Sequence, residues 1–168
     1  VYKRQAWISA LTDEGPTCLV LTRQNLPQYE TSGEGALRGG YILVDSEKEK
    51  PDAILLASGS EVELAVNARK LLKEKGIDVR VVSVPCAELF DRQPEAYREK
   101  VLPSDVRARV AVEMGSPDSW YRYVGLDGKT IAMTTFGASA PFRDLLVKFG
   151  FTAERVADET EKLLSKNA

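Results

Sequence analysis

The chain alternates between short apolar runs and segments in which apolar residues recur every three or four positions. The short runs are rich in strand-forming residues and predict strands at 17–22, 41–44, 53–57, 79–84, 109–113 and 129–135. The remaining segments predict helices at 61–75, 86–92, 94–102, 119–124 and 141–149, and a last helix after residue 152. Strands that alternate with helices predict an α/β domain with three layers. We expect a mainly parallel five-stranded sheet in which 41–44 is an antiparallel edge strand.

Local signals predict where several helices begin and end. Ser60 and Glu63 have the spacing of a capping box, in which two side chains bind free backbone amides at a helix start. The helix that follows is expected to stop at Gly76. Thr152 is placed to cap the last helix. Before it, an apolar stripe is predicted on the helix that starts near Pro141, formed by Phe142, Leu145, Leu146 and Phe149.

Composition divides the chain into three parts. Residues 27–40 hold one proline and four glycines with little periodicity, and this predicts a linker. We expect residues 1–26 to be the tail of a preceding domain, namely its last helix and a strand at 17–22 buried on both faces. Residues 41–168 are expected to form a C-terminal domain. Because the chain begins with valine, we expect a fragment, and we do not take residues 1–5 as native.

The absence of histidine restricts the possible chemistry most strongly. It excludes Ser-His-Asp and Cys-His nucleophile systems, histidine metal sites and an imidazole general base. Any reaction must therefore use other residue types or be completed by another polypeptide.

Charge and cysteine content exclude further classes of protein. The 23 basic and 25 acidic residues give a net charge of −2, so nucleic acid is not an expected partner. No apolar run approaches the roughly 20 residues that span a bilayer, so no membrane partner is expected. Cys18 and Cys86 lie far apart among apolar neighbours in the sequence, which predicts reduced, buried thiols and a cytoplasmic protein.

Two positions could bind an anion. Arg23 follows the predicted strand 17–22, and ligands gather at the carboxyl ends of strands in α/β sheets. A guanidinium group there suits phosphate, and the alternative is a surface salt bridge. Gly59 and Ser60 precede a predicted helix whose free amides could hold an anion or a regulatory ligand. Glu61 and Glu63 already bring negative charge there, which favours a structural cap.

Several segments, taken in order, resemble the end of transketolase. Ala6-Trp7, Gly15-Pro16-Thr17 and Leu21-Thr22-Arg23-Gln24-Asn25-Leu26-Pro27 resemble the end of the family's pyrimidine-binding domain. Its C-terminal domain is matched by Arg38-Gly39-Gly40-Tyr41, Ala57-Ser58-Gly59-Ser60-Glu61-Val62, Val82-Ser83-Val84-Pro85-Cys86, Phe90-Asp91-x-Gln93, Val101-Leu102-Pro103, Arg109-Val110-Ala111-Val112-Glu113, Trp120-x-x-Tyr123-Val124-Gly125 and Thr135-Phe136-Gly137-x-Ser139-Ala140-Pro141. The series covers nearly the whole chain after residue 5.

The resemblance implies a transferase of the pentose phosphate pathway, which moves a two-carbon ketol unit from a ketose phosphate to an aldose phosphate. The family's cofactors are thiamine diphosphate and Mg²⁺ (or Ca²⁺), and its active sites lie at a homodimer interface. Arg23 matches the family's substrate-phosphate arginine. We expect no catalytic, cofactor-binding or metal-binding residue in this chain, because those residues belong to the missing N-terminal and pyrimidine-binding domains. The chain alone is therefore expected to be inactive.

The sequence departs from the family in two places and leaves two alternatives open. The family's metal loop reads Gly-Asp-Gly, but Leu126 precedes Asp127 here, so we predict a plain turn at 125–128. Ala138 stands where many members carry an acidic residue, which affects only a local interaction at a helix start. One alternative to a fragment is the small subunit of a split enzyme. The other is a stand-alone domain that binds a regulatory ligand at Gly59, Ser60 and Glu61.

Overall fold

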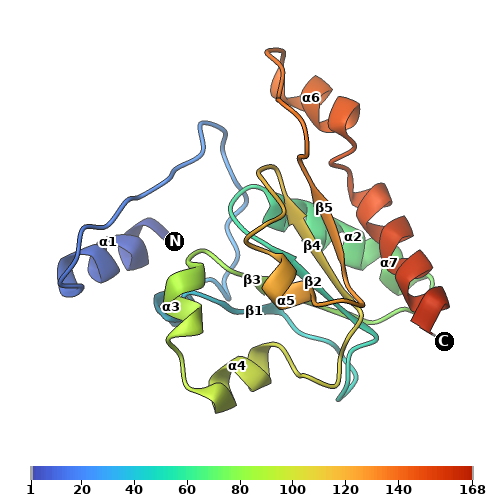
Figure 1. Ribbon diagram of the computed structural model, residues 1–168, viewed down its shortest axis with the longest axis horizontal. Coiled ribbons are helices and arrows are strands. Elements are labelled where there is room, and N and C mark those ends of the chain that lie inside the picture. Colours follow the sequence, from blue (N-terminus) through green and yellow to red (C-terminus); the bar gives the residue numbers. More distant parts are fainter. Residues whose placement is uncertain (1, 168) are drawn as a thin grey trace.

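A computed structural model describes residues 2–167 of the chain (Figure 1). The elements are α1 (Tyr2–Thr12), the 3-10 helix η1 (Glu34–Arg38), β1 (Tyr41–Val44), β2 (Ala53–Ala57), α2 (Glu61–Glu74), β3 (Val79–Ser83), α3 (Ala87–Asp91), α4 (Glu95–Val101), β4 (Arg109–Glu113), α5 (Tyr121–Val124), β5 (Lys129–Ala132), α6 (Phe142–Phe149) and α7 (Ala153–Asn167). Every helix and strand predicted after residue 40 is present, with ends that differ by a few residues.

The five strands form one sheet in the order β1-β3-β2-β4-β5. The edge strand β1 is antiparallel to β3, and the other neighbouring pairs are parallel. In the central strand, Leu55 pairs with Val81 of β3 and with Val110 of β4. The predicted α/β class, the mainly parallel sheet and the antiparallel edge strand are confirmed.

Helices cover both faces of the sheet and complete the three layers (Figure 1). Successive strand residues point to opposite faces, so the central strand contributes to two cores. Leu55 and Val110 pack in the core beneath α2 and α7. Ile54 packs in the other core, with Phe90 of α3 and Trp120 beside α5. Both cores are fully buried at the centre of the sheet, and this apolar burial is the main stabilising contribution to the fold.

The predicted helix ends are confirmed at Gly76 and Thr152. Gly76 adopts a φ of +77°, a left-handed conformation that glycine accepts readily. The Thr152 hydroxyl accepts a hydrogen bond from the Arg155 amide at 3.2 Å. The capping box predicted at Ser60 is wrong, because this side chain donates to the carboxylate of Glu61 instead of bonding the backbone.

The predicted strand at 17–22 does not form. This stretch has no regular structure and lies on the surface, with Val20 90% and Leu21 62% exposed. Cys18 is exposed as well, so the prediction that it is buried among apolar residues is wrong. A strand buried on both faces requires flanking strands, and the described strands all belong to the sheet further along the chain.

The predicted linker folds onto the domain over its second half. The Thr31 hydroxyl donates to the Leu43 carbonyl of β1 at 2.7 Å, and Ser32 and Ala36 are buried. Residues 31–40 of the predicted linker therefore pack against the domain. The division of the chain into two domains on either side of it stays a prediction.

The apolar stripe predicted on α6 is only partly covered. Leu146 and Phe149 contact the core beneath α2 and α7, but Phe142 stays exposed. In Figure 1, α6 stands out from the end of the sheet, beyond β5.

Candidate functional site

The first candidate site lies at the carboxyl edge of the sheet, between β2 and β4. The chain passes from β2 to β3 on one side of β2, and later returns to β4 on the other side. In open α/β sheets this change of direction leaves a crevice in which ligands commonly bind. Here the crevice is bordered by the turn that leads from β2 into α2 and by the residues that follow β4.

Glu61 occupies this crevice as a structural group. Its side chain is only 6% exposed and accepts hydrogen bonds from the Ser60 hydroxyl at 2.6 Å and from the Met114 amide at 2.8 Å. Burial raises the pKa of Glu61 above its usual value, and the nearby charge of Glu113 raises it further. The two hydrogen bonds oppose this rise but do not cancel it. Glu61 thus joins the start of α2 to the end of β4.

Glu113 is also fully engaged. Its carboxylate accepts hydrogen bonds from the Gly115 amide at 2.8 Å and from the indole N–H of Trp120 at 3.0 Å. Two carboxylates therefore stand where an anion would bind, and they would repel it. The predicted alternative, a structural helix start at Gly59 and Ser60, agrees with these contacts, although no side chain caps the helix.

Arg23 is exposed and belongs to the stretch between α1 and β1, which runs outside the sheet (Figure 1). Within residues 2–167, its guanidinium group makes no hydrogen bond or ion pair. The strand that was predicted to end at Arg23 is absent, so its placement at a carboxyl edge is not reproduced in this chain. Since it has no partner here, the alternative of a surface salt bridge is not observed either.

The described residues form no group that could hold a metal ion. No cluster of three or more histidine, cysteine, aspartate or glutamate residues occurs among them. Asp127 is ion-paired with Arg107, and Leu126 beside it is fully exposed, as expected for a plain turn. Among the helices of residues 2–167, none is both long and apolar enough to span a bilayer.

Cys86 has no feature of a nucleophile. It is half-buried, and its thiol lies 3.5 Å from the Glu88 carboxylate. Burial raises the pKa of Cys86, and the Glu88 carboxylate raises it further. The thiol is therefore protonated at neutral pH, which agrees with the predicted structural role.

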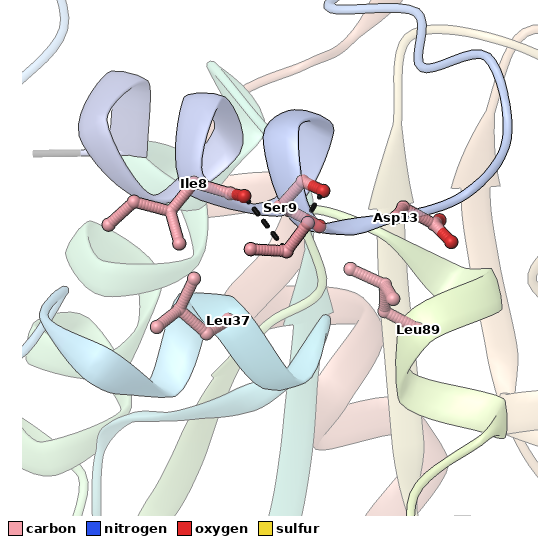
Figure 2. A pocket seen from close by; sticks show the side chains of 6 residues that line it. Ile8, Ser9, Asp13, Leu37 and Leu89 are labelled. Atoms are coloured by element: carbon pink, nitrogen blue, oxygen red, sulfur yellow. Dashed lines mark hydrogen bonds between the residues drawn. The ribbon is translucent and has the colours of Figure 1, made fainter.

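A second candidate site, which the sequence patterns did not indicate, lies between α1, η1 and α3. A cavity of about 350 Å³ is lined there by Ile8, Ser9, Thr12, Asp13, Leu37 and Leu89. Figure 2 shows Ile8 and Ser9 of α1 on one side, facing Leu37 of η1 and Leu89 of α3. The carboxylate of Asp13 lies 3.9 Å from the guanidinium group of Arg92, next to α3. This contact area is where the segment before Arg23 meets the C-terminal domain.

Next to this cavity, η1 runs into a tightly held corner at Gly39 and Gly40. The Cys86 amide donates to the Gly39 carbonyl at 3.0 Å, and the Tyr97 hydroxyl donates to the Gly40 carbonyl at 2.9 Å. The Arg38 guanidinium group stacks 4.5 Å from the centre of the Tyr97 ring. The sequence signal for this corner is the Arg38-Gly39-Gly40-Tyr41 segment, whose composition suggested mobility.

Comparisons with known proteins agree on one family. A family model described as transketolase-like TK C-terminal domain matches residues 39–152. The chain is 52% identical over 164 residues to transketolase 1 of Vibrio vulnificus, and 51% identical over 154 residues to transketolase 1 of Escherichia coli. These matches cover 95% and 90% of this chain, but 24% and 23% of the relatives. The chain thus spans about a quarter of the length of these relatives.

Solved structures give the same picture. Transketolase from Leishmania mexicana matches 96% of this chain with a TM-score of 0.89 and 42% identity, and the match covers 23% of that protein. A split-gene transketolase matches 85% of this chain with a TM-score of 0.66, but at 22% identity this likeness shows the fold alone. The matched family model and the high identity to the Vibrio relative together show that the chain belongs to the transketolase family and contains its C-terminal domain.

Proposed function

We propose that this chain is the C-terminal part of a thiamine diphosphate-dependent transketolase, which transfers a two-carbon ketol unit between sugar phosphates. The observation that carries the proposal is the 52% identity to transketolase 1 of Vibrio vulnificus over 95% of the chain. Related structures from Pichia stipitis, 40% identical to this chain, are described as complexes with sedoheptulose 7-phosphate and xylulose 5-phosphate. These complexes support sugar phosphates as the substrates.

Arg23 is the residue that we assign to the substrate phosphate. It lies in the Thr22-Arg23-Gln24-Asn25 stretch that resembles the family, and its guanidinium group is exposed and unpaired in the described part of the chain. A charge-assisted, bidentate contact to phosphate would fix the remote end of the sugar. Fixing that end orients the reacting carbonyl group, which lowers the entropic part of the barrier.

The remaining machinery belongs to other parts of the enzyme. Thiamine diphosphate and Mg²⁺ (or Ca²⁺) would be held by the preceding domains and by the partner subunit of a homodimer. This division is supported by the lack of histidine and by the absence of a metal cluster among residues 2–167. Two cysteines without a disulfide agree with a cytoplasmic enzyme. We infer that the purified chain shows no ketol transfer with added cofactors, and measurable turnover would contradict this.

The test of Arg23 compares two donors in a whole transketolase that carries this sequence as its C-terminal part. Arg23→Ala should reduce kcat/KM for xylulose 5-phosphate by about 1.5–3 kcal/mol of transition-state free energy, the scale of a hydrogen bond to a charged group. The value for unphosphorylated xylulose should change little. Arg143→Ala is the matched control, since Arg143 is an exposed arginine on α6. Equal losses for both donors would show that Arg23 is structural.

A split enzyme is a second candidate. One structural neighbour is described as a split-gene transketolase in an inactive β4 tetramer, and its fold resembles this chain. The sequence immediately upstream of Val1 in the gene distinguishes the two cases. A continuous reading frame with the diphosphate loop supports a single polypeptide, whereas a start codon near residue 1 supports a separate small subunit.

A further inference from the structure

We propose that the C-terminal domain positions Arg23 through the η1 corner, a proposal that rests on the proposed role of Arg23 in binding phosphate. The η1 corner comprises η1, Gly39 and Gly40, together with Leu89 and Tyr97, which cover it. Residues 13–31, called the Arg23 arm here, leave this corner and return to it. Arg23 lies near the middle of the arm, ten residues after Asp13 and eight before Thr31.

The first end of the arm is held at the corner by α1. This helix packs on η1, and Ile8 and Leu37 line the same cavity from opposite sides (Figure 2). The Asp13 amide donates to the Ser9 carbonyl at 2.9 Å, which extends the last turn of the helix. The Asp13 carboxylate lies 3.9 Å from Arg92, so the arm begins beside α3.

The second end of the arm is bonded to the sheet directly before η1. The Thr31 hydroxyl donates to the Leu43 carbonyl, and the Ser32 amide donates to the Tyr29 carbonyl at 3.0 Å. Ser32 is 2% exposed, so the backbone is already inside the domain at this point. Both ends of the Arg23 arm are therefore fixed to neighbouring parts of one corner.

The corner itself has little freedom to move. Gly39 has a φ of +78°, and a Cβ atom there would lie 2.6 Å from the Cβ of Leu89. A Cβ on Gly40 would lie 2.7 Å from the Phe90 ring. Tyr97 bonds the Gly40 carbonyl and stacks against Arg38, so its one ring holds both sides of the turn. A corner this close-packed gives the two ends of the arm a fixed support, because packed interiors move little.

This arrangement gives the C-terminal domain a part in substrate binding without contact to the reacting atoms. The sugar phosphate is held productively only if the Arg23 guanidinium group stays aligned with the phosphate. A misplacement of about 1 Å can cost on the order of 100-fold in rate. Leu37 and Tyr97 are thus positioning residues that act through Arg23. Their loss should weaken donors that carry a phosphate and spare donors that lack it.

The experiment uses the whole enzyme and two matched pairs of variants. Leu37→Ala should raise KM for xylulose 5-phosphate about tenfold and leave kcat and the KM for xylulose within about twofold. Its control is Leu126→Ala, since Leu126 is a fully exposed leucine in the 125–128 turn. Tyr97→Leu should act like Leu37→Ala, and Tyr97→Phe should recover part of the loss because it keeps the ring beneath Arg38.

Tyr123→Phe controls for a general loss of stability. Tyr123 is a buried tyrosine whose hydroxyl donates a hydrogen bond to Asp91 at 2.8 Å. Its replacement by phenylalanine should lower the melting temperature and affect the activity with both donors equally. The inference is overturned if Leu37→Ala affects both donors equally or behaves like Leu126→Ala. If Arg23→Ala impairs xylulose 5-phosphate more than xylulose and Leu37→Ala does not, this inference alone fails. If Arg23→Ala impairs both donors equally, the proposed function of Arg23 fails first.

Discussion

Gly39→Ala tests whether the η1 corner is as tightly built as its geometry indicates. The substitution combines two perturbations at one position. A φ of +78° disfavours any residue with a Cβ atom, at a cost of about 1–2 kcal/mol. The added methyl group would also lie 2.6 Å from the Leu89 Cβ, and closer still to the Cys86 carbonyl oxygen and the Phe90 nitrogen.

The steric part of this cost should be the larger one. The two closest atoms belong to the backbone at the start of α3, and the Cys86 amide bonds Gly39 itself. Neither atom can withdraw without breaking that bond or moving α3 off the core. Relief of such a clash costs about 1–3 kcal/mol or more. The total expected loss in the free energy of unfolding is therefore about 2–5 kcal/mol.

Two other glycines separate the two contributions. Gly76 has a φ of +77°, and no atom lies within 4 Å of the position that a Cβ would take there, so Gly76→Ala should cost only the conformational part, about 1–2 kcal/mol. Gly137 has equally open surroundings and no positive φ, so Gly137→Ala should change stability by less than about 0.5 kcal/mol. Urea denaturation followed by circular dichroism measures all three. A loss for Gly39→Ala no larger than that for Gly76→Ala would refute the close packing of the corner.

Two further predictions concern buried polar groups. Because burial holds the pKa of Glu61 above its usual value, the folded state binds its proton more tightly than the unfolded state, and stability falls as pH rises through that range. Glu61→Gln should therefore be more stable than wild type at pH 8 and lose this advantage near pH 4, as measured by pH-dependent melting. The Ser32 hydroxyl is buried and has no partner among the described residues, so Ser32→Ala should keep or raise the melting temperature. Thr31→Val, which removes the bond to Leu43, should instead cost about 1 kcal/mol, and equal effects of the two changes would contradict the assignment.

The sheet could be predicted from the sequence because every strand finds its pairing partners within the chain. The run at Ala53–Ala57 is apolar at every position, and all five residues are buried between β3 and β4. The predicted edge strand Tyr41–Val44 is apolar at all four positions as well, and in the structure its residues alternate between buried and partly buried. Side-chain periodicity reports burial, and here the covering helices lie in the same sequence.

The η1 corner could not be predicted in the same way. Gly35, Gly39 and Gly40 suggested mobility by composition, yet each lies against a neighbour that leaves no room for a side chain. A glycine chosen for close approach looks the same in a sequence as a glycine chosen for freedom. The difference lies in residues far along the chain, such as Phe90 and Tyr97, and no local pattern connects them to the corner.

The stretch before Arg23 is the opposite case, in which the sequence predicts a buried element that the structure lacks. Its apolar run predicts a buried strand, and burial of a side chain such as Val20 or Leu21 is worth about 1.5–3 kcal/mol. In the described chain both are exposed, so this free energy is not gained. Neighbouring strands would recover it, and the chain spans only about a quarter of its transketolase relatives. The strand prediction at 17–22 is therefore conditional on neighbouring strands that the described residues do not supply. The placement of Arg23 at its end depends on the same condition, whereas the corner that holds both ends of the Arg23 arm is complete within this chain.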